Sequence, residues 1–368
     1  MISLLKILGR FASKCISKQK RQLDFKFTEK SKIWILGYGG IGDHLFLVPL
    51  IQSLSQEYQV IFFYNKKFEK LIPIFAFSKN VEFIVYKSFD LFLKLFKRRI
   101  SDKEPVIFSF DGSFVVSIIS VLFRTYFFGL LDNKKLMTIS GIQNVNEKLF
   151  FKSNYYKSNL YQLLAFKSFN SSREFITPKI NSAYFSSCED NIHSQLKSLK
   201  YIVLSPEKSI GWEFGELSES FIEIFSQRLF SKFGYKAVVI GGREKVRGSE
   251  FYIDLRGKTQ VTDLPYILSN ALVIVSADNG LLHLTNLLGM AKKVITFFSF
   301  SNPKLFSHPN NKIWFKRDLP CMPCIPAKNN HFDINQKFVC PINGKCLETF
   351  NNENFMKYIF QEINNENK

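Results

Sequence analysis

The chain has 368 residues and a formal net charge of +19, and 46% of its residues are hydrophobic against 22% that are charged. This balance excludes a disordered chain, and the length is sufficient for two domains. Lysine, arginine or aspartate interrupts every apolar run before it reaches the roughly 20 residues of a membrane-spanning helix, so no such helix is expected.

The excess of positive charge indicates an anionic partner: nucleic acid, an anionic membrane or a phosphorylated substrate. An alternative source is biased coding composition, because Lys, Asn, Phe and Ile are all plentiful. The densest basic clusters, at residues 18–21 and 94–99, accompany no RNA-binding aromatic motif and no helix-turn-helix pattern. We therefore expect no nucleic-acid partner.

Residues 1–22 form a basic segment whose cations and apolar residues each recur at helical spacing. The cations are Lys6, Arg10, Lys14 and Lys18, and the apolar residues are Leu4, Leu8, Phe11 and Cys15. This spacing predicts an amphipathic helix, which either lies on the anionic inner face of a membrane or packs on the protein's own surface. The cations interrupt what would be the apolar core of a secretory signal, so we expect a cytoplasmic protein.

Short β-branched and aromatic runs alternate with longer amphipathic stretches along the rest of the chain. Strands are expected at residues 32–36, 59–64, 81–86 and 106–110, and then at 201–204, 236–240, 272–276 and 293–297. Strands that alternate with helices form parallel sheets, so the chain is predicted to be an α/β protein.

The stretch from Ser168 to Glu189 is rich in serine and asparagine and contains Pro178, which suits a connection between domains. We predict an amino-terminal domain of residues 23–190, a carboxyl-terminal domain of residues 191–350 and a terminal helix over residues 351–368. Two such domains that face one another would bind ligands between the carboxyl ends of their strands.

A glycine-rich turn follows the first predicted strand and leads to Asp43 at the start of a helix. Its glycines lack a Cβ, so a ligand can approach the backbone closely; they include Gly37, Gly39, Gly40 and Gly42. The spacing also satisfies a dinucleotide fingerprint, but no acid follows the next strand near Asn65 to hold a ribose. A dehydrogenase is therefore the weaker interpretation.

A second motif, Ser276 to Thr285, follows the apolar run at residues 272–275. It combines an acid, a glycine and the amino end of a helix: Asp278, Asn279, Gly280, Leu281 and His283. Backbone N–H groups at a helix start can hold a diphosphate, and Asp278 and His283 add polar contacts to phosphate, ribose or sugar. The alternative is an ordinary helix cap followed by a buried histidine.

The order of the motifs resembles glycosyltransferase family nine, the ADP-heptose lipopolysaccharide heptosyltransferases. Matching residues extend over about residues 32–350 and are Gly42-Asp43, Pro49, Trp212, Gly241-Gly242 with Glu244, and Asp278 with Gly280 and His283. The resemblance implies the GT-B type of fold, with two facing Rossmann-like, doubly wound domains. It further implies an inverting transfer of heptose, or a related sugar, from a nucleotide diphosphate that the second domain holds.

The resemblance assigns a role to each motif and needs no catalytic cofactor. Asp43 becomes the catalytic base, which takes the proton of the acceptor hydroxyl. The acceptor loop then comprises Gly39, Gly40 and Gly42, and the diphosphate would be held by Asp278, Asn279, Gly280, Leu281 and His283. Gly241 and Gly242 would belong to the donor-binding site, with Glu244 at the nucleoside ribose.

The chain departs from the family pattern near the donor. The usual Pro-Gly reads Pro206-Glu207, Ile210 replaces the lysine before Trp212, and Glu213 replaces the proline after it. Lys208 is then a candidate for the phosphate contact, and a solvated surface lysine is the alternative. These departures concern donor identity more than reaction type.

Four cysteines are crowded near the end of the chain with the spacing C-x2-C-x15-C-x5-C: Cys321, Cys324, Cys340 and Cys346. The spacing suits one structural zinc or iron ion in a cysteine-rich carboxyl-terminal loop, and reduced cysteines or two disulfides are the alternatives. By resemblance, family members that modify autotransporter proteins carry a similar cysteine finger that binds iron. No open-position histidine or carboxylate accompanies the cluster, so a catalytic metal is not expected.

Two acceptors stay open. The amphipathic amino end favours a lipopolysaccharide core or another surface glycan or glycolipid, whereas the cysteine cluster favours a protein acceptor. A non-enzymatic binder of anionic surfaces would predict a charged face without an ordered set of ligand-binding strand ends, and this chain has such a set.

Overall fold

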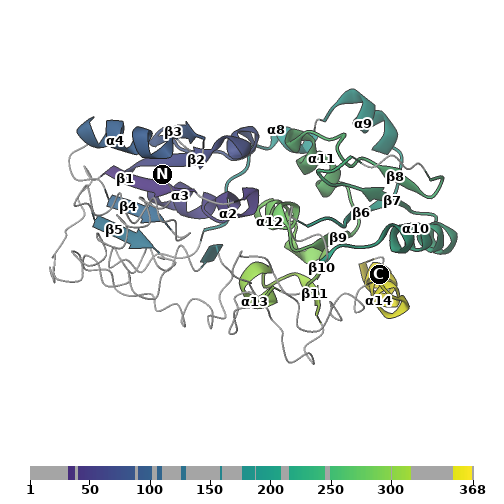
Figure 1. The fold of residues 1–368 in the computed structure, drawn as a ribbon. Coiled ribbons are helices and arrows are strands. Elements are labelled where there is room, and N and C mark those ends of the chain that lie inside the picture. Colours follow the sequence, from purple (N-terminus) through teal and green to yellow (C-terminus); the bar gives the residue numbers. More distant parts are fainter. Residues whose placement is uncertain are drawn as a thin grey trace. The chain divides into compact units, whose positions relative to one another are not determined.

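The computed structural model describes residues 32–37, 40–87, 90–101, 106–109, 126–129, 158–159, 176–186, 188–208, 215–244, 249–299, 301–315 and 351–366. The chain divides into two compact units, Met1–Ile180 and Asn181–Lys368, and each is described by itself (Figure 1). The basic segment at residues 1–22 and the four clustered cysteines lie outside the described residues.

The first unit contains a parallel sheet of five strands in the order β3-β2-β1-β4-β5. The strands are β1 (Lys32–Leu36), β2 (Gln59–Asn65), β3 (Val81–Tyr86), β4 (Val106–Ser109) and β5 (Tyr126–Gly129). The helices are α2 (Ile41–Leu45), α3 (Val48–Leu54), the 3-10 helix η1 (Lys66–Ile74) and α4 (Leu91–Ser101). The first four strands agree with the sequence prediction, and β5 was not predicted.

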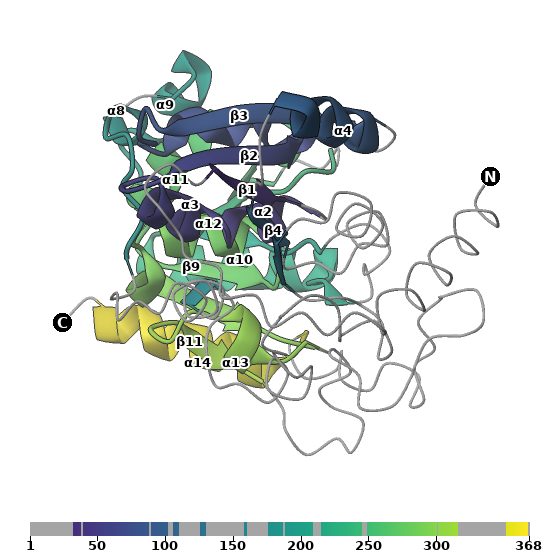
Figure 2. The same ribbon diagram turned by 90° about the vertical axis from the view of Figure 1, so that its left-hand side faces the viewer.

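Side chains alternate between the two faces of this sheet, as the two-residue period of a strand requires. Trp34 and Phe63 pack on one face with Leu91 and Leu95 of α4, which lies over β2 and β3 (Figure 2). Phe62 points to the other face, where its ring meets Phe68 of η1 at a centroid distance of 5.8 Å. The abundant phenylalanine of this chain therefore fills both sides of the sheet.

The second unit contains a parallel sheet of six strands in the order β11-β10-β9-β6-β7-β8. The strands are β6 (Tyr201–Ser205), β7 (Lys236–Val239), β8 (Tyr252–Asp254), β9 (Ile274–Ala277), β10 (Val294–Phe297) and β11 (Lys312–Trp314). The helices are α8 (Ala183–Ser186), α9 (Asp190–Leu196), α10 (Glu219–Phe233), η3 (Val261–Asp263), α11 (Leu264–Ser269), α12 (Gly280–Leu287), η4 (Ala291–Lys293), α13 (Pro303–Phe306) and α14 (Glu353–Glu366).

Both sheets are doubly wound, with the first strand of the unit in the interior of the sheet. The chain reverses direction across the sheet between β1 and β4 in the first unit and between β6 and β9 in the second. Parallel sheets of this kind bind ligands beyond the carboxyl ends of the strands at such a reversal. The predicted α/β class is therefore confirmed, and each unit has one place where a site is expected.

Helix α10 begins and ends at residues that are suited to cap a helix. Ser218 caps its start, since the side-chain oxygen accepts a hydrogen bond of 3.1 Å from the N–H of Phe221. Gly234 ends it with φ at +68°, a conformation that favours glycine. Its buried face carries Phe225, whose ring stacks on Phe360 of α14 at 5.2 Å, so the terminal helix belongs to the core of the second unit.

No helix in the described ranges combines the length and the apolar character that crossing a bilayer requires.

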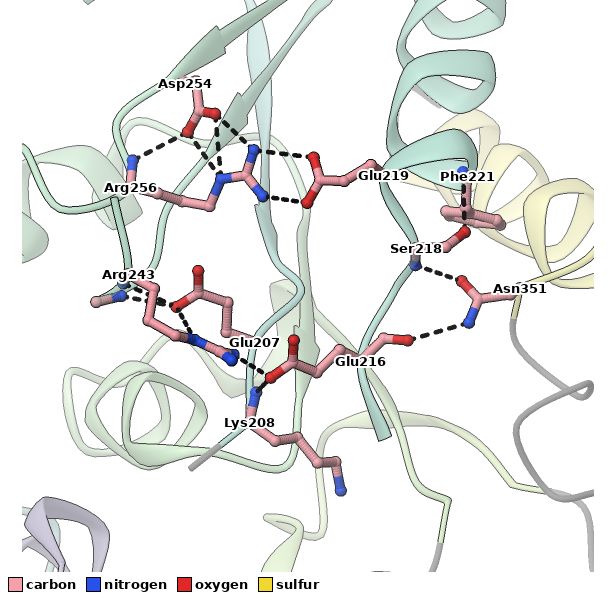
Figure 3. A network of polar contacts seen from close by, with 11 residues as sticks. Glu207, Lys208, Glu216, Ser218, Glu219, Phe221, Arg243, Asp254, Arg256 and Asn351 are labelled. Carbon is pink, nitrogen blue, oxygen red and sulfur yellow. Dashed lines mark hydrogen bonds and ion pairs between the residues drawn. The ribbon is translucent and has the colours of Figure 1, made fainter. Parts of the chain in front are cut away.

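Arg256, directly after β8, is completely buried yet fully paired (Figure 3). Its Nε lies 2.9 Å from Asp254 Oδ1, and its two terminal nitrogens reach Glu219 at 2.7 and 3.1 Å. Burial lowers the pKa of Arg256, but hydrogen bonds to Asp254 and Glu219 outweigh it, so the net shift is upward. The network ties the first turn of α10 to the sheet.

Arg256→Met should destabilise the chain by about 3–5 kcal/mol, because it leaves Asp254 as an uncompensated buried charge. The matched control is Arg228→Met, which removes a half-exposed pair with Glu353 and should cost less than about 1 kcal/mol. Chemical denaturation followed by circular dichroism gives both values. Equal losses for the two variants would contradict a structural role for the Arg256 network.

Candidate active site

Asp43 lies in the first turn of α2, just beyond the carboxyl end of β1 and so beside the reversal of the first sheet. Its carboxylate is partly buried, and Oδ2 accepts a hydrogen bond of 2.9 Å from the N–H of Gly40. Gly42 lies within the same helical turn, and Gly39 is outside the described residues. The structure thus holds the Asp43 carboxylate beside the end of β1.

His44 fixes the turn that carries Asp43. Its Nε2 accepts a hydrogen bond of 3.1 Å from the N–H of Asn65, so Nδ1 must carry the proton that is donated to the carbonyl of Gly40 at 2.8 Å. The ring is buried and stacks on Phe68 at 5.3 Å. The histidine therefore joins the glycine-rich turn to the end of β2 in one neutral tautomer.

Gly37 must be glycine for this arrangement to form. A Cβ at this position would lie 2.6 Å from Cδ2 of the His44 ring and 3.0 Å from Phe62. Its carbonyl also accepts a hydrogen bond from the hydroxyl of Tyr86 on β3. The first glycine of the motif thus serves packing rather than a ligand.

In the second unit, the side chain of Asn279 connects the turns that follow β6 and β9. Its Nδ2 donates to Ser205 Oγ at 2.9 Å and to the carbonyl of Glu207 at 2.7 Å. Its Oδ1 accepts a hydrogen bond of 3.0 Å from the N–H of Leu282 and so caps α12. Asn279 was predicted as a donor contact, and here its side chain holds the two strand ends together.

Asp278 and His283 come together beside this cap. Asp278 Oδ1 lies 3.7 Å from His283 Nε2, and Oδ2 accepts a hydrogen bond from Ser301, which follows β10. Both side chains are largely buried. Gly280 and Leu281 form the partly exposed first turn of α12 next to them. The predicted diphosphate residues therefore occupy one edge of the sheet.

Lys208 extends toward the same edge and is buried rather than a solvated surface lysine. A Cβ on Gly215 would lie 2.7 Å from Lys208 Cδ and 2.7 Å from Ser299 Oγ, so the lysine stem passes close to the residues that follow β10. The backbone N–H of Lys208 donates a hydrogen bond of 2.9 Å to Glu216 Oε1. This placement is compatible with the predicted contact between Lys208 and phosphate.

Glu207 follows β6, and its side chain reaches the turn after β7 (Figure 3). Its Oε2 accepts hydrogen bonds from the N–H groups of Gly242 at 2.9 Å and Arg243 at 3.2 Å. Gly241 must lack a Cβ, which would otherwise lie 2.5 Å from this carboxylate. The N–H of Gly242, a predicted donor-binding residue, is thus directed at a side chain of the same unit.

Glu244 is exposed, and its backbone lies against Gly257 of the neighbouring turn, which has φ at +71°.

Sequence reasoning missed Ser301, Glu216 and the role of Glu207. Ser299 and Ser301 follow the predicted strand at residues 293–297, so the rule of carboxyl strand ends could have identified them. Pairing between Glu207 and the turn after β7 leaves no such signal, because it depends on side-chain direction.

Stability should depend on pH through His44. Burial lowers the pKa of this histidine below its usual 6.5, so the unfolded chain binds more protons than the folded chain as the pH falls below 6.5. The stabilising effect of the neutral ring is therefore complete above pH 6.5 and is lost as the pH falls toward the folded-state pKa. The melting-temperature difference between wild type and His44→Gln should shrink between pH 7.5 and pH 5.

Burial also lowers the pKa of His308, but wild type and His44→Gln both contain that histidine. Its effect therefore cancels in the melting-temperature difference between them. A difference that stays constant over this range would show that His44 does not titrate in this way.

Comparisons with known proteins bear on these sites. Residues 232–332 match the model of Glycosyltransferase family 9 (heptosyltransferase), a range that includes β7, β9, α12 and β10. A comparison with curated protein sequences found no match.

Several solved structures share the fold. A glycosyl transferase family 9 protein from Veillonella parvula superposes with a TM-score of 0.63 and 12% identity, over 83% of this chain and 93% of that one. The ADP-heptose lipopolysaccharide heptosyltransferase II of E. coli gives 0.59 and 15%, over 78% and 91%. The iron-containing dodecameric glycosyltransferase TibC of enterotoxigenic E. coli gives 0.59 and 12%, over 94% and 78%, and TibC also has a structure in complex with ADP-D-β-D-heptose.

At these identities the structures establish a common fold. The sequence match over residues 232–332 confirms the resemblance to glycosyltransferase family 9 in that range and supports a glycosyltransferase enzyme.

Proposed function

We propose that the chain transfers a heptose, or a related sugar, with inversion from a nucleotide diphosphate to a surface glycan. The observation that carries the proposal is the group of Asp278, His283 and the start of α12 at the reversal of the second sheet. ADP-heptose is the first donor to test, because relatives of this fold include enzymes named for it or bound to it.

The donor diphosphate would lie at the amino end of α12. Backbone N–H groups that no helical carbonyl accepts point outward there, and the helix dipole favours negative charge. Lys208 would add a full positive charge, and His283 a further polar contact. Asp278 would act through His283, because its Oδ1 lies 3.7 Å from His283 Nε2 and so keeps that histidine beside the diphosphate.

Asp43 would act as the base. Its carboxylate takes the proton from the acceptor hydroxyl, the hydroxyl oxygen forms a bond to the anomeric carbon, and the bond from that carbon to the diphosphate oxygen breaks. Attack opposite the leaving diphosphate inverts the anomeric centre. The departing nucleoside diphosphate keeps the electron pair of the broken bond, and the reaction needs no cofactor.

The acceptor we propose is a lipopolysaccharide core or another surface glycan, reached at the cytoplasmic face of the membrane. The basic amphipathic pattern of residues 1–22 supports such a location, since each basic residue near an anionic surface contributes roughly 1 kcal/mol. A protein acceptor is the second candidate. It is favoured by the superposition with TibC, which covers 94% of this chain.

Asp43→Asn should abolish transfer and leave the affinity for ADP within a few-fold of wild type, because the change removes the base without changing the donor site. Asp278→Asn and His283→Ala should instead weaken both transfer and ADP binding. Calorimetric titration with ADP and a transfer assay with ADP-heptose separate the two groups.

Nearly full turnover by Asp43→Asn would exclude this base. Normal ADP binding by both donor-site variants would place the donor elsewhere. A thermal-shift screen with ADP-, UDP- and GDP-linked sugars identifies the donor, because a ligand that binds only the folded chain raises its melting temperature.

We also propose one structural metal ion, iron or zinc, at Cys321, Cys324, Cys340 and Cys346. Four thiolates at this spacing are a suitable donor set for either ion, and TibC is described as iron-containing. The ion would fold the residues around it, because such a site does not exist in the unfolded chain.

Protein purified without chelator should contain about one equivalent of zinc or iron by elemental analysis. Cys321→Ser with Cys324→Ser should release it and lower the melting temperature, while ADP binding persists. Less than about a tenth of an equivalent, with four free thiols by titration, would show that the cluster is reduced cysteine.

A further inference from the structure

Glu207 holds a carboxylate oxygen that the fold leaves without a partner. Its Oε2 accepts two backbone hydrogen bonds, but its Oε1 is buried and has no hydrogen-bond partner among the described residues. The residue is 6% exposed. In Figure 3 the dashed lines from Glu207 all leave from the same oxygen, and the other carries none.

Leaving such an oxygen unsatisfied is costly. A buried polar group without a partner costs about 1–3 kcal/mol, and more when it is charged. Oε2 cannot relieve the cost by rotation of the carboxylate, because the N–H groups of Gly242 and Arg243 hold it on one side. The other oxygen is thus kept in place for a hydrogen-bond donor from outside the described chain.

The position of Glu207 indicates which group of a nucleotide sugar would donate a hydrogen bond to Oε1. Glu207 lies in the turn after β6 and its side chain contacts the turn after β7, whereas Asp278 and the start of α12 lie after β9, on the other side of β6 in the sheet. With the diphosphate at α12, a nucleoside that extends toward β7 would pass Glu207. A carboxylate accepts hydrogen bonds and repels phosphate, so its partner there is a hydroxyl or an amino group.

We infer that Glu207 Oε1 binds a hydroxyl of the donor ribose and thereby selects nucleotides whose ribose is intact. The ribose is common to all nucleoside diphosphates and lies next to the diphosphate, so the inference holds whichever base the donor carries. It rests on the proposed function only in assuming a nucleotide donor. It also gives this contact to the residue at which the chain departs from the Pro-Gly of the family it resembles, and not to the exposed Glu244.

The test pairs a change in the protein with a change in the ligand. Wild type and Glu207→Ala, both as the full chain, are titrated with the nucleoside diphosphate that wild type binds best among ADP, UDP and GDP, and with its 2′-deoxy and 3′-deoxy forms. Wild type should bind one deoxy form roughly 10- to 100-fold more weakly than the parent, the range for a hydrogen bond to a charged group. Glu207→Ala should bind the parent and that deoxy form equally.

Two further variants keep the test decisive. Glu223→Ala removes a carboxylate on the surface of α10 and should retain wild-type selectivity. Glu207→Gln serves if Glu207→Ala does not fold: the two N–H donors hold its amide oxygen at the Oε2 position, which leaves NH₂ at the Oε1 position. Charge assistance is then lost, so selectivity should fall several-fold while the melting temperature stays close to wild type.

The outcomes separate the two proposals. If wild type binds no nucleoside diphosphate, the proposed function fails and the inference fails with it. If wild type binds one but selectivity for the ribose hydroxyl is absent, or is the same in the Glu207 variants, then Oε1 does not contact the ribose. That result overturns the inference and leaves the proposed function intact.

Discussion

The second unit depends on the side-chain amide of Asn279. One amide makes four hydrogen bonds: its nitrogen donates two to the turn after β6, and its oxygen accepts one from the N–H of Leu282 and one from the hydroxyl of Ser276. These bonds start α12, and they bring the turns after β6 and β9 together at the reversal of the sheet. The positions of Asp278 before the helix, His283 within it and Glu207 across from it all follow from this cap.

Two buried charges in the same unit show how structural and functional roles differ. Arg256 is enclosed by two carboxylates that satisfy its guanidinium, as expected for a charge that only holds α10 to the sheet. Glu207 receives hydrogen bonds on one oxygen and not on the other. Folding energy alone gives no reason to keep a half-satisfied carboxylate, so its presence is better explained by a ligand.

Much of the fold could be predicted from the sequence because seven of the eight predicted strands lie in the interior of a sheet, where burial on both faces gives an apolar run, and the eighth, β3, is an edge strand of six residues. The strands that were missed, β5, β8 and β11, have only four, three and three residues. Each lies at the edge of its sheet, where burial is incomplete and the hydrophobic pattern is weak. Short edge strands form by pairing with a neighbour already in place, and local sequence carries little of that information.

The candidate site likewise has features that the sequence predicts and features that it does not. Asp43, Asp278 and Lys208 were predicted from motifs that follow strands and from the family resemblance, and chain order alone brings strand ends to one edge. The contacts among the side chains were not predictable in this way. Asn279 connects the two strand ends, and Gly37 and Gly241 make room for His44 and Glu207. Each of these contacts joins residues far apart in the sequence, so it can be predicted only after both segments have been placed in the fold.

The neutral state of His44 links the packing of the first unit to its proposed chemistry. A protonated imidazole could no longer accept the N–H of Asn65, so the glycine-rich turn would lose its connection to β2. It would also place a cation next in sequence to Asp43, and a neighbouring cation weakens a carboxylate as a proton acceptor. Burial against Phe68 disfavours that cation. The same apolar contact that orders the turn thus also protects the proton-accepting capacity of Asp43, and the two effects cannot be separated by a change at Phe68 alone.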